Sequence, residues 1–465
     1  MREAHLLQRN KELNPFLGTC TYEGLMANSP IHKRRVHFVN RFYYPDESAT
    51  SAMLTDLING LDTSTYDVSV ITGKSYYTSD LGELPAHEMI GDVNVRRIAS
   101  LRVFNGSMLG RIINYILFHF LAAFLVLKNV RRGDIVVCLT DPPLLSVTLF
   151  GPTLLKGGQL VNWVQDIFPE VAAGLSFGGP LSKLAPILQP VRDAVWRRSA
   201  MNVVIGDRMG DLVQSRGVIE DRISVIPNWC DELALTPQND RGLAIRQEWG
   251  LSEDDFIVMY SGNLGRAHDI STILGAMKEL HRSGLSQVKF VFVGGGAQSE
   301  ALRNSIKAAG INSAYFFPYR PKSELAQSLS VGDVHWISLA PELEGMIVPS
   351  KFFGVGAVAR PSIFVGSEDG ELAQIQREAD CGWQVNQGDS QAFTALVQRL
   401  LADPREVAIA GQNARRALET ILHRRARISQ WQNLLEALSA EGRGTLSSGE
   451  PAPVLANEAR AEPAE

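Results

Sequence analysis

Residues 256–269 read FIVMYSGNLGRAHD, and this stretch places a strand directly before a glycine turn and a helix. The first five residues are apolar throughout, as expected of a parallel strand that is buried on both faces. An amphipathic helical pattern follows Asp269. A strand, a turn and a helix in this order are the unit from which parallel α/β sheets are built.

Strand-like runs of the same kind recur along the chain, and longer helical patterns separate them. The other runs are residues 36–40, 66–72, 134–140, 159–164, 201–205, 223–226, 289–293, 334–338 and 362–365. We therefore predict an α/β fold of parallel sheets with helices on both faces. The 465 residues are about twice what one hydrophobic core usually supports, so we expect two sheets in two domains.

The strand-like run at 223–226, which ends at a proline, and the polar stretch at 236–241 predict the boundary between the two domains. We place the first domain at 34–228, the second at 229–415, and a last helix at 416–440 that could pack back on the first domain. Residues 1–33 and 441–465 have compositions typical of disordered tails.

Composition narrows the functional class and the compartment. The formal net charge is −5, so no global basic field favours nucleic acid, and we expect no nucleic-acid partner. The cysteines are far apart and form no C-x-x-C pair, which argues against a disulfide framework or a zinc site. These cysteines, and the absence of a secretory signal pattern, predict a cytoplasmic protein. The cysteines are Cys20, Cys138, Cys230 and Cys381.

Residues 111–128 read RIINYILFHFLAAFLVLK, the most apolar stretch of the chain. Its apolar part is shorter than the ~20 residues of a spanning helix, so we do not expect a transmembrane segment. Two interpretations remain open: a buried helix, or a helix lying on a membrane surface with Tyr115, Phe118 and Phe120 at headgroup level. The second predicts peripheral contact with the inner face of the membrane through residues 108–132.

Ligands of doubly wound sheets bind at the carboxyl ends of strands, so the loops after strands hold the candidate site residues. Gly262 and Gly265 would let backbone N–H groups approach an anion, and the next helix would add its positive N-terminal end. Arg266 could hold a phosphate there, although a plain turn explains the pattern too. The glycines at 294–296 match neither G-x-G-x-x-G nor a P-loop, which disfavours nicotinamide and ATP.

Residues 341–351 read PELEGMIVPSK and follow another strand. Ser350 and Lys351 open an apolar helix and suit a diphosphate, while Glu344 suits the hydroxyls of a ribose or hexose. A capped helix with surface charges is the alternative.

Two loops of the first domain carry polar groups. Ser48, Thr50 and Ser51 could cap a helix or hydrogen-bond a substrate. Asp166 could orient a sugar hydroxyl, take a proton, or cap a turn.

Together these stretches resemble the GT-B glycosyltransferases of family 4, in particular the colanic-acid and O-antigen branch. The matching stretches are PDESATS (45–51), WVQDIFP (163–169), VIPNW (225–229), YSGNLGRAH (260–268), VPSKFF (348–353) and RP (360–361).

The resemblance implies two Rossmann-like domains facing a cleft, with the acceptor on the first domain and the nucleotide-sugar on the second. It implies a retaining hexosyltransferase without a protein nucleophile, without a metal or other cofactor, and with a lipid-linked glycan acceptor. Asp166, Arg266, Glu344 and Lys351 would be catalytic, and Ser48, Thr50 and Ser51 would face the acceptor. The donor would contact Gly262, Asn263, Gly294, Tyr319, Arg320, Ile347, Val348, Ser350 and Glu371.

The chain departs from the family pattern at two places. The second glutamate, seven residues after Glu344, is replaced by Phe352, or by Gly354 in the other register, and Glu371 is a possible substitute. The usual histidine of the first domain is replaced by Gln165 or Asp166. The missing second glutamate leaves a non-catalytic subunit of a polysaccharide assembly complex as an alternative. A nucleotide-sugar epimerase of the same two-domain shape and an α/β enzyme of another nucleotide also stay as alternatives.

Overall fold

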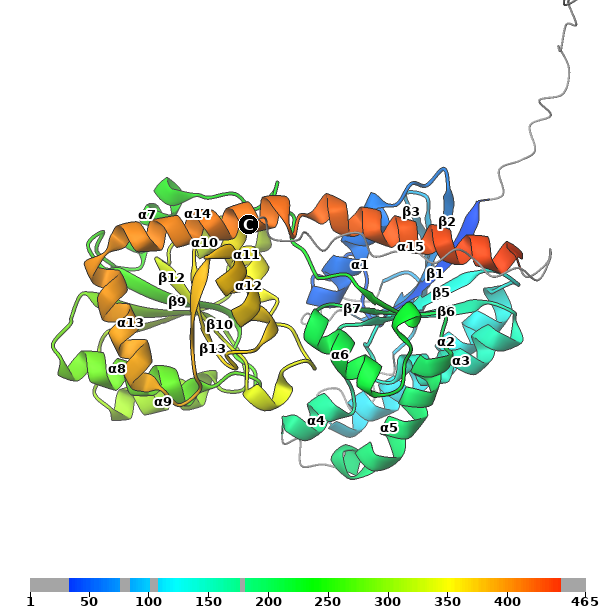
Figure 1. Cartoon of the computed structure of the whole chain (residues 1–465), viewed down its shortest axis with the longest axis horizontal. Coiled ribbons are helices and arrows are strands. Elements are labelled where there is room, and N and C mark those ends of the chain that lie inside the picture. The colour runs from blue at the N-terminus through cyan, green and yellow to red at the C-terminus, as the bar shows by residue number, and fades with distance from the viewer. Residues whose placement is uncertain (1–32, 76–83, 101–107, 176–179, 445–465) are drawn as a thin grey trace, which may run out of the picture. The chain divides into compact units, whose positions relative to one another are not determined.

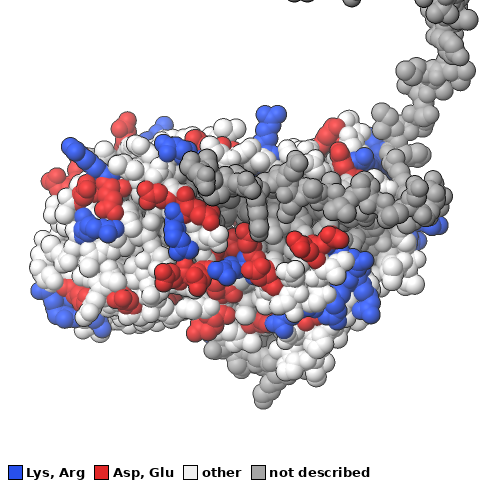
Figure 2. All heavy atoms as spheres, in the orientation of Figure 1, with Lys and Arg blue, Asp and Glu red and all other residues white. Residues whose placement is uncertain are grey.

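The computed structural model describes residues 33–75, 84–100, 108–175 and 180–444. It confirms the predicted α/β fold, with two largely parallel sheets that each have helices packed against them (Figure 1). On the face drawn in Figure 2, acidic and basic side chains are interspersed, in keeping with the small net charge.

Within the described residues, the first sheet has eight strands in the order β3-β4-β2-β1-β5-β6-β7-β8. All neighbours are parallel except β3 and β4. The strands are β1 (Arg34–Val39), β2 (Tyr66–Gly73), β3 (His87–Ile90), β4 (Val93–Ile98), β5 (Ile135–Cys138), β6 (Gln159–Val164), β7 (Met201–Val204) and β8 (Ile223–Val225). The helices are α1 (Ala49–Gly60), α2 (Met108–Asn129), α3 (Leu145–Leu155), α4 (Glu170–Gly174), α5 (Pro180–Arg198), α6 (Asp207–Ser215) and the 3-10 turn η1 (Glu220–Arg222).

The second sheet, in the part of the chain that the structure describes, has six parallel strands in the order β11-β10-β9-β12-β13-β14. They are β9 (Phe256–Asn263), β10 (Val288–Gly295), β11 (Ala314–Phe317), β12 (Val334–Ser338), β13 (Ser362–Val365) and β14 (Gly382–Val385). The helices are α7 (Asn239–Glu248), α8 (Ile270–Arg282), α9 (Ser299–Ala308), α10 (Leu325–Leu329), α11 (Lys351–Ala357), α12 (Glu371–Ala379), α13 (Ser390–Ala402), α14 (Pro404–Thr420) and α15 (Arg424–Gly444). Two 3-10 turns, η2 (Lys322–Glu324) and η3 (Pro341–Leu343), complete this half.

Every run predicted as a strand is one, and four further strands were not predicted. These are β3, β4, β11 and β14, which lie at or next to the sheet edges. Edge strands are covered on fewer sides, so they need less apolar sequence than the central strands do. The central β5 is buried at every position, whereas β3 alternates between exposed and half-buried residues.

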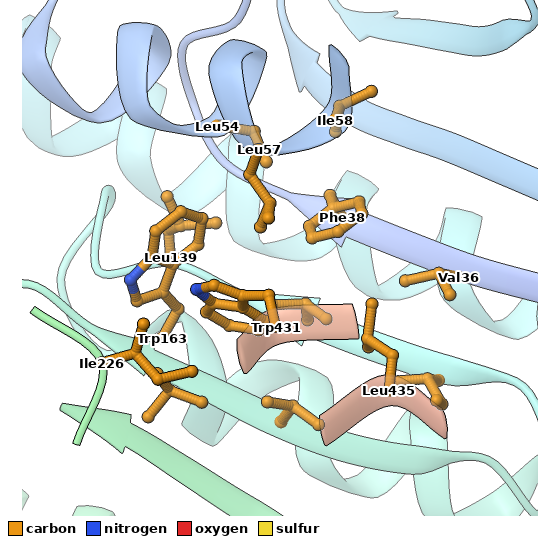
Figure 3. Close-up of a cluster of buried hydrophobic side chains, with 14 of the residues drawn as sticks. Val36, Phe38, Leu54, Leu57, Ile58, Leu139, Trp163, Ile226, Trp431 and Leu435 are labelled. Atoms are coloured by element: carbon orange, nitrogen blue, oxygen red, sulfur yellow. The ribbon is translucent and has the colours of Figure 1, made fainter. Parts of the chain in front are cut away.

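The helical pattern near the C-terminus is two helices, and the second one completes the core of the first domain. Trp431 and Leu435 of α15 point in among Phe38, Leu57 and Trp163 (Figure 3). The ring centroids of Trp163 and Trp431 are 4.7 Å apart. Helix α15 runs to Gly444, so it includes the first residues of the tail predicted from 441; the rest of both predicted tails lies outside the described residues.

Helix α2 packs one side against the core and leaves the other side exposed, so it is not buried all round. Phe118 packs into the core below the helix, while Phe120 is 70% and Phe124 60% exposed. Among the described residues, Gly110–Asn129 is the one stretch long and apolar enough to cross a membrane, so the expectation that it is too short was wrong. Phe118 was assigned wrongly to the headgroup level, since it is buried, whereas Tyr115 is half-buried and lies against Arg41.

Candidate functional site

Two glycines lie side by side at the carboxyl edge of the second sheet. Gly262 in β9 pairs with Gly294 in β10, and both have positive φ angles, 134° and 117°. A Cβ on Gly294 would lie 2.4 Å from the carbonyl oxygen of Gly262 and 2.8 Å from the ring of Tyr319. Glycine is therefore required at 294, because any side chain would collide with backbone atoms.

Lys351, the first residue of α11, extends over Gly262. A Cβ on Gly262 would lie 2.8 Å from Cε of Lys351, so the missing side chain leaves the space that the lysine fills. The ammonium nitrogen is 5.3 Å from the centroid of the Tyr260 ring. Burial lowers the pKa of Lys351 from 10.5 to about 8.

His268 holds the Lys351 ammonium group in place. Its Nδ1 is 2.8 Å from the carbonyl oxygen of Ser338, which can only accept, so Nδ1 carries the proton. The unprotonated Nε2 then accepts from Nζ of Lys351 at 3.2 Å. Burial and the Lys351 charge lower the pKa of His268 to about 4, which keeps the ring neutral. His268 was in the quoted turn, but its spacing from Lys351 gave no sign of this contact.

The N-terminus of α8 is already occupied, contrary to the expectation that it would bind an anion. The carboxylate of Asp269 accepts from the backbone N–H of Ser271 at 2.9 Å and of Thr272 at 3.3 Å. The cationic side chains near this turn are Lys351 and Arg266, and Arg266 is exposed in the turn before the helix.

Glu344 lies in the loop before Lys351, and one of its oxygens has no partner. Oε1 accepts from the backbone N–H of Glu371 at 2.9 Å, which caps α12. Oε2 is buried without a hydrogen bond among the described residues. Burial raises the pKa of this carboxyl group. An unsatisfied buried acceptor of this kind suits a ligand hydroxyl.

Glu371 binds the first domain through its side chain. Its carboxylate accepts from the backbone N–H of Arg208 at 3.1 Å, at the start of α6. A Cβ on Gly206 would lie 2.6 Å from this carboxylate, so the glycine makes room for it. Burial raises the pKa of Glu371. Glu371 thus links the start of α12 to the start of α6 and lies beside Glu344.

Asp166 meets the same loop from the first domain. It forms an antiparallel bridge with Ile347, and Ile167 donates its N–H to the carbonyl oxygen of Met346 at 3.0 Å. Burial, followed by the charge of Asp141, raises the pKa of Asp166 to about 6. Its neighbour Gln165 exchanges two hydrogen bonds with Asn228, which leaves Asp166 as the available group.

The loop from Glu344 to Lys351 therefore brings together most of the predicted catalytic residues. Val348 in this loop packs against the core of the first domain, beside Ile347 in its bridge with Asp166. Ser350 is exposed at the start of α11, as Asn263 is at the end of β9.

One predicted donor contact, Arg320, is engaged elsewhere, whereas the neighbouring Tyr319 lies near the glycine pair. Arg320 pairs with Glu248 and Glu324, and Tyr319 beside it is exposed against Gly294.

In the first domain, Ser51 is fully buried and donates to the carbonyl oxygen of Asp46 at 2.7 Å. This bond stabilises the turn, so Ser51 is not placed to contact an acceptor. Thr50 accepts from Asn40 at 3.4 Å. Ser48 is the N-cap residue of α1 but makes no side-chain cap.

Comparison with known proteins supports a glycosyltransferase. Residues 243–417 match the family described as Glycosyl transferases group 1. The chain is 26% identical over 285 residues to WbjE of Pseudomonas aeruginosa, named a probable glycosyltransferase, covering 60% of this chain and 69% of that one. It is 23% identical over 275 residues to WcaI of Escherichia coli (strain K12), named for colanic acid biosynthesis, covering 57% and 65%.

Solved structures of the same fold include sucrose-phosphate synthase from Thermosynechococcus elongatus, with a TM-score of 0.71, 16% identity and coverage of 88% and 100%. Anabaena HepE in complex with UDP and glucose has a TM-score of 0.65, 14% identity and coverage of 86% and 99%. The fold is GT-B, and with the family match over 243–417 it supports a glycosyltransferase of the polysaccharide biosynthesis type.

Proposed function

We propose that this chain is a retaining glycosyltransferase that moves a hexose from a nucleotide-diphosphate sugar to a lipid-linked glycan in exopolysaccharide or O-antigen biosynthesis. The observation that carries the proposal is the half-buried Lys351 ammonium, held over Gly262 by a neutral histidine. The structure of HepE with UDP and glucose supports a nucleotide-sugar donor.

In this proposal Lys351 stabilises the leaving diphosphate. A phosphate oxygen would replace Nε2 of His268 as the hydrogen-bond partner of the Lys351 ammonium group. Its negative charge would stabilise the charged form of Lys351, which burial disfavours. Gly262 and Gly294 let the diphosphate approach the backbone, with Arg266 at the open side. Tyr319, exposed beside Gly294, would contact the nucleotide base.

The transfer itself would form one bond and break one bond at the anomeric carbon. The acceptor hydroxyl oxygen bonds to this carbon as the bond to the diphosphate oxygen breaks, and the diphosphate keeps the electron pair and takes the hydroxyl proton. Asp166 would orient the acceptor hydroxyl, and Oε2 of Glu344 would accept from a hydroxyl of the hexose. We propose no metal or cofactor for this step, since Lys351 supplies positive charge at the diphosphate.

The acceptor proposal is supported by the exposed apolar stripe of α2. Ile116, Phe120 and Phe124 recur at helical spacing, and each is at least half exposed. Arg111, Lys128, Arg131 and Arg132 flank the stripe. An amphipathic helix of this kind lies in a membrane interface, so we propose a cytoplasmic enzyme that is peripheral at the membrane through residues 108–132.

The test is release of nucleoside diphosphate from the donor in the presence of acceptor-containing membranes. Lys351→Ala should lower turnover roughly 100-fold or more, because it removes charge stabilisation at the leaving group. Lys307→Ala, at an exposed position of α9, is the matched control and should keep full activity. Equal turnover in the Lys351→Ala variant would contradict the proposed site.

A further inference from the structure

A hollow lies at the carboxyl edge of the first sheet, built from residues other than those of the proposed donor site. It is built from the ends of β1, β2 and β4 together with the first part of α2. Its lining consists of Arg41, Gly73, Ser75, Ile98, Ala99, Ser100, Asn114 and Phe118. The proposed transfer step uses none of these residues.

Arg41 is the charged group of this hollow, and its backbone is fixed on both sides. Its N–H donates to the carbonyl oxygen of Asp141 at 2.8 Å, and its carbonyl oxygen accepts from the N–H of Gly73 at 2.9 Å. A Cβ on Gly73 would lie 2.9 Å from that carbonyl oxygen, so the close approach requires glycine.

The guanidinium group of Arg41 lies against aromatic rings. It is 4.6 Å from the centroid of Tyr115, on α2, and 5.0 Å from that of Phe42. Contact with ring faces orients the planar guanidinium while leaving its edge N–H groups able to donate to another partner.

The remaining lining suits an anion. Burial raises the pKa of Asp141 to about 6, and the nearby charge of Arg41 opposes this rise, yet the structure records no ion pair of Arg41 with any described carboxylate. The polar lining groups are the hydroxyls of Ser75 and Ser100, which hydrogen-bond each other, and the amide of Asn114. A guanidinium with hydroxyl donors, and without a carboxylate among the described lining residues, matches the chemistry of a phosphate group.

We propose that this hollow binds a phosphate ester of the acceptor substrate, as a site separate from the donor diphosphate site. This inference rests on the proposed function insofar as the ester belongs to the acceptor. Asn114 and Phe118 line the hollow, whereas Ile116 and Phe120, two residues further on in each case, are exposed. Residues two apart point to roughly opposite sides of a helix, so the hollow would lie about 10 Å, one helix diameter, above a membrane contacted by α2.

The first experiment measures binding of inorganic phosphate and of pyrophosphate by titration calorimetry, in the full-length Lys351→Ala protein. That background removes the main cation of the donor site. Arg41→Gln should weaken the remaining binding at least about tenfold, the loss of one charge-assisted contact. Arg41→Lys, which keeps the charge but not the planar fork, should lose less. Arg282→Gln, at an exposed position of the second domain, should leave the affinity unchanged.

A second arm distinguishes the source of the phosphate. Vesicles of phosphatidylcholine, with and without phosphatidic acid, present a phosphate monoester on a lipid. If Arg41→Gln weakens binding to the phosphatidic acid vesicles as well as to inorganic phosphate, the ester is lipid-linked. If it weakens only inorganic phosphate binding, the site takes a soluble phosphate ester.

Equal phosphate affinity in the Arg41→Gln and Arg282→Gln proteins, both folded by circular dichroism, would overturn the proposal. Because these are binding measurements, they are independent of sugar transfer. A protein that binds phosphate through Arg41 but releases no nucleoside diphosphate would contradict the proposed function and leave this site standing.

Discussion

At the scale of single residues, the account depends on a lysine whose charge is costly to keep in the ligand-free protein. Lys351 is half-buried beside a neutral His268 and has no carboxylate partner among the described residues. Placing an anionic diphosphate beside this ammonium group removes the cost, so the unpaired charge favours binding of the donor.

This arrangement predicts a pH dependence on the alkaline side. Lys351 has a pKa of about 8 in the free protein, so its charged form is lost as the pH rises through 8. kcat/KM, which reports the free enzyme, should fall above pH 8, while kcat should hold to higher pH because the bound diphosphate favours the charged form. Lys351→Arg should move the limb of kcat/KM upward, since arginine stays charged. A wild-type profile that is flat from pH 7 to 10 would contradict this role.

Glu344 gives a second prediction at this scale. Glu344→Gln keeps the shape but replaces an acceptor by an amide, so it should raise KM for the donor or lower kcat by roughly tenfold, the value of one charged hydrogen bond. Glu342→Gln, at the exposed position two residues earlier, is the matched control. Identical donor kinetics for both variants would rule out contact of Glu344 with the donor.

The sequence indicated Gly262, Glu344 and Lys351 as site residues because they stand in loops that follow strands, where doubly wound sheets bind their ligands. It did not indicate His268 as their neighbour or Arg208 as the partner of Glu371. Those contacts join residues 83 and 163 positions apart, and only the tertiary structure sets them.

At the scale of elements, α2 shows what a periodic pattern can and cannot decide. The sequence is apolar nearly all round, so it predicted a helix but not which face would be covered. Packing on the first sheet covers Phe118, Ala122 and Val126, and the other face stays exposed.

The exposed face makes α2 testable by itself. The double variant Phe120→Ser, Phe124→Ser should weaken sedimentation with anionic vesicles about tenfold or more, since it removes two large apolar contacts. Its folding should be little affected, because both side chains are exposed. The control variant Ile421→Ser removes an exposed apolar side chain elsewhere and should bind vesicles as the wild type does. If this control binds vesicles as weakly as the double variant, the exposed face of α2 is not the membrane contact.

At the scale of the whole molecule, the order of elements along the chain differs from their grouping in space. Helix α15 follows the second domain but places Trp431 in the core of the first. Arg424 at the start of α15 pairs with Asp56 of α1. The sequence suggested a returning helix, but it could not show that Trp431 would lie against Trp163, because no local pattern encodes that contact.

Trp431 should therefore stabilise the first domain, although it is far from the rest of that domain in the sequence. Trp431→Ala should lower the free energy of unfolding by about 3–5 kcal/mol, through lost burial and the cavity left behind. Leu233→Ala, at a highly exposed position, should change it by less than about 0.5 kcal/mol. Urea unfolding followed by tryptophan fluorescence and by circular dichroism measures both, and a small effect of Trp431→Ala would show that α15 is not part of the core.

The central claim is that the second domain binds a nucleotide-sugar at Lys351. The most direct measurement is thermal stabilisation of the purified protein by UDP-, GDP- and TDP-sugars, with ATP and NAD as controls, in the wild type, in Lys351→Ala and in Lys307→Ala. The account predicts that one class of nucleotide-sugar raises the Tm of the wild type and of Lys307→Ala, and that Lys351→Ala loses most of this shift. A shift with ATP or NAD alone, or a nucleotide-sugar shift that Lys351→Ala retains in full, would contradict it.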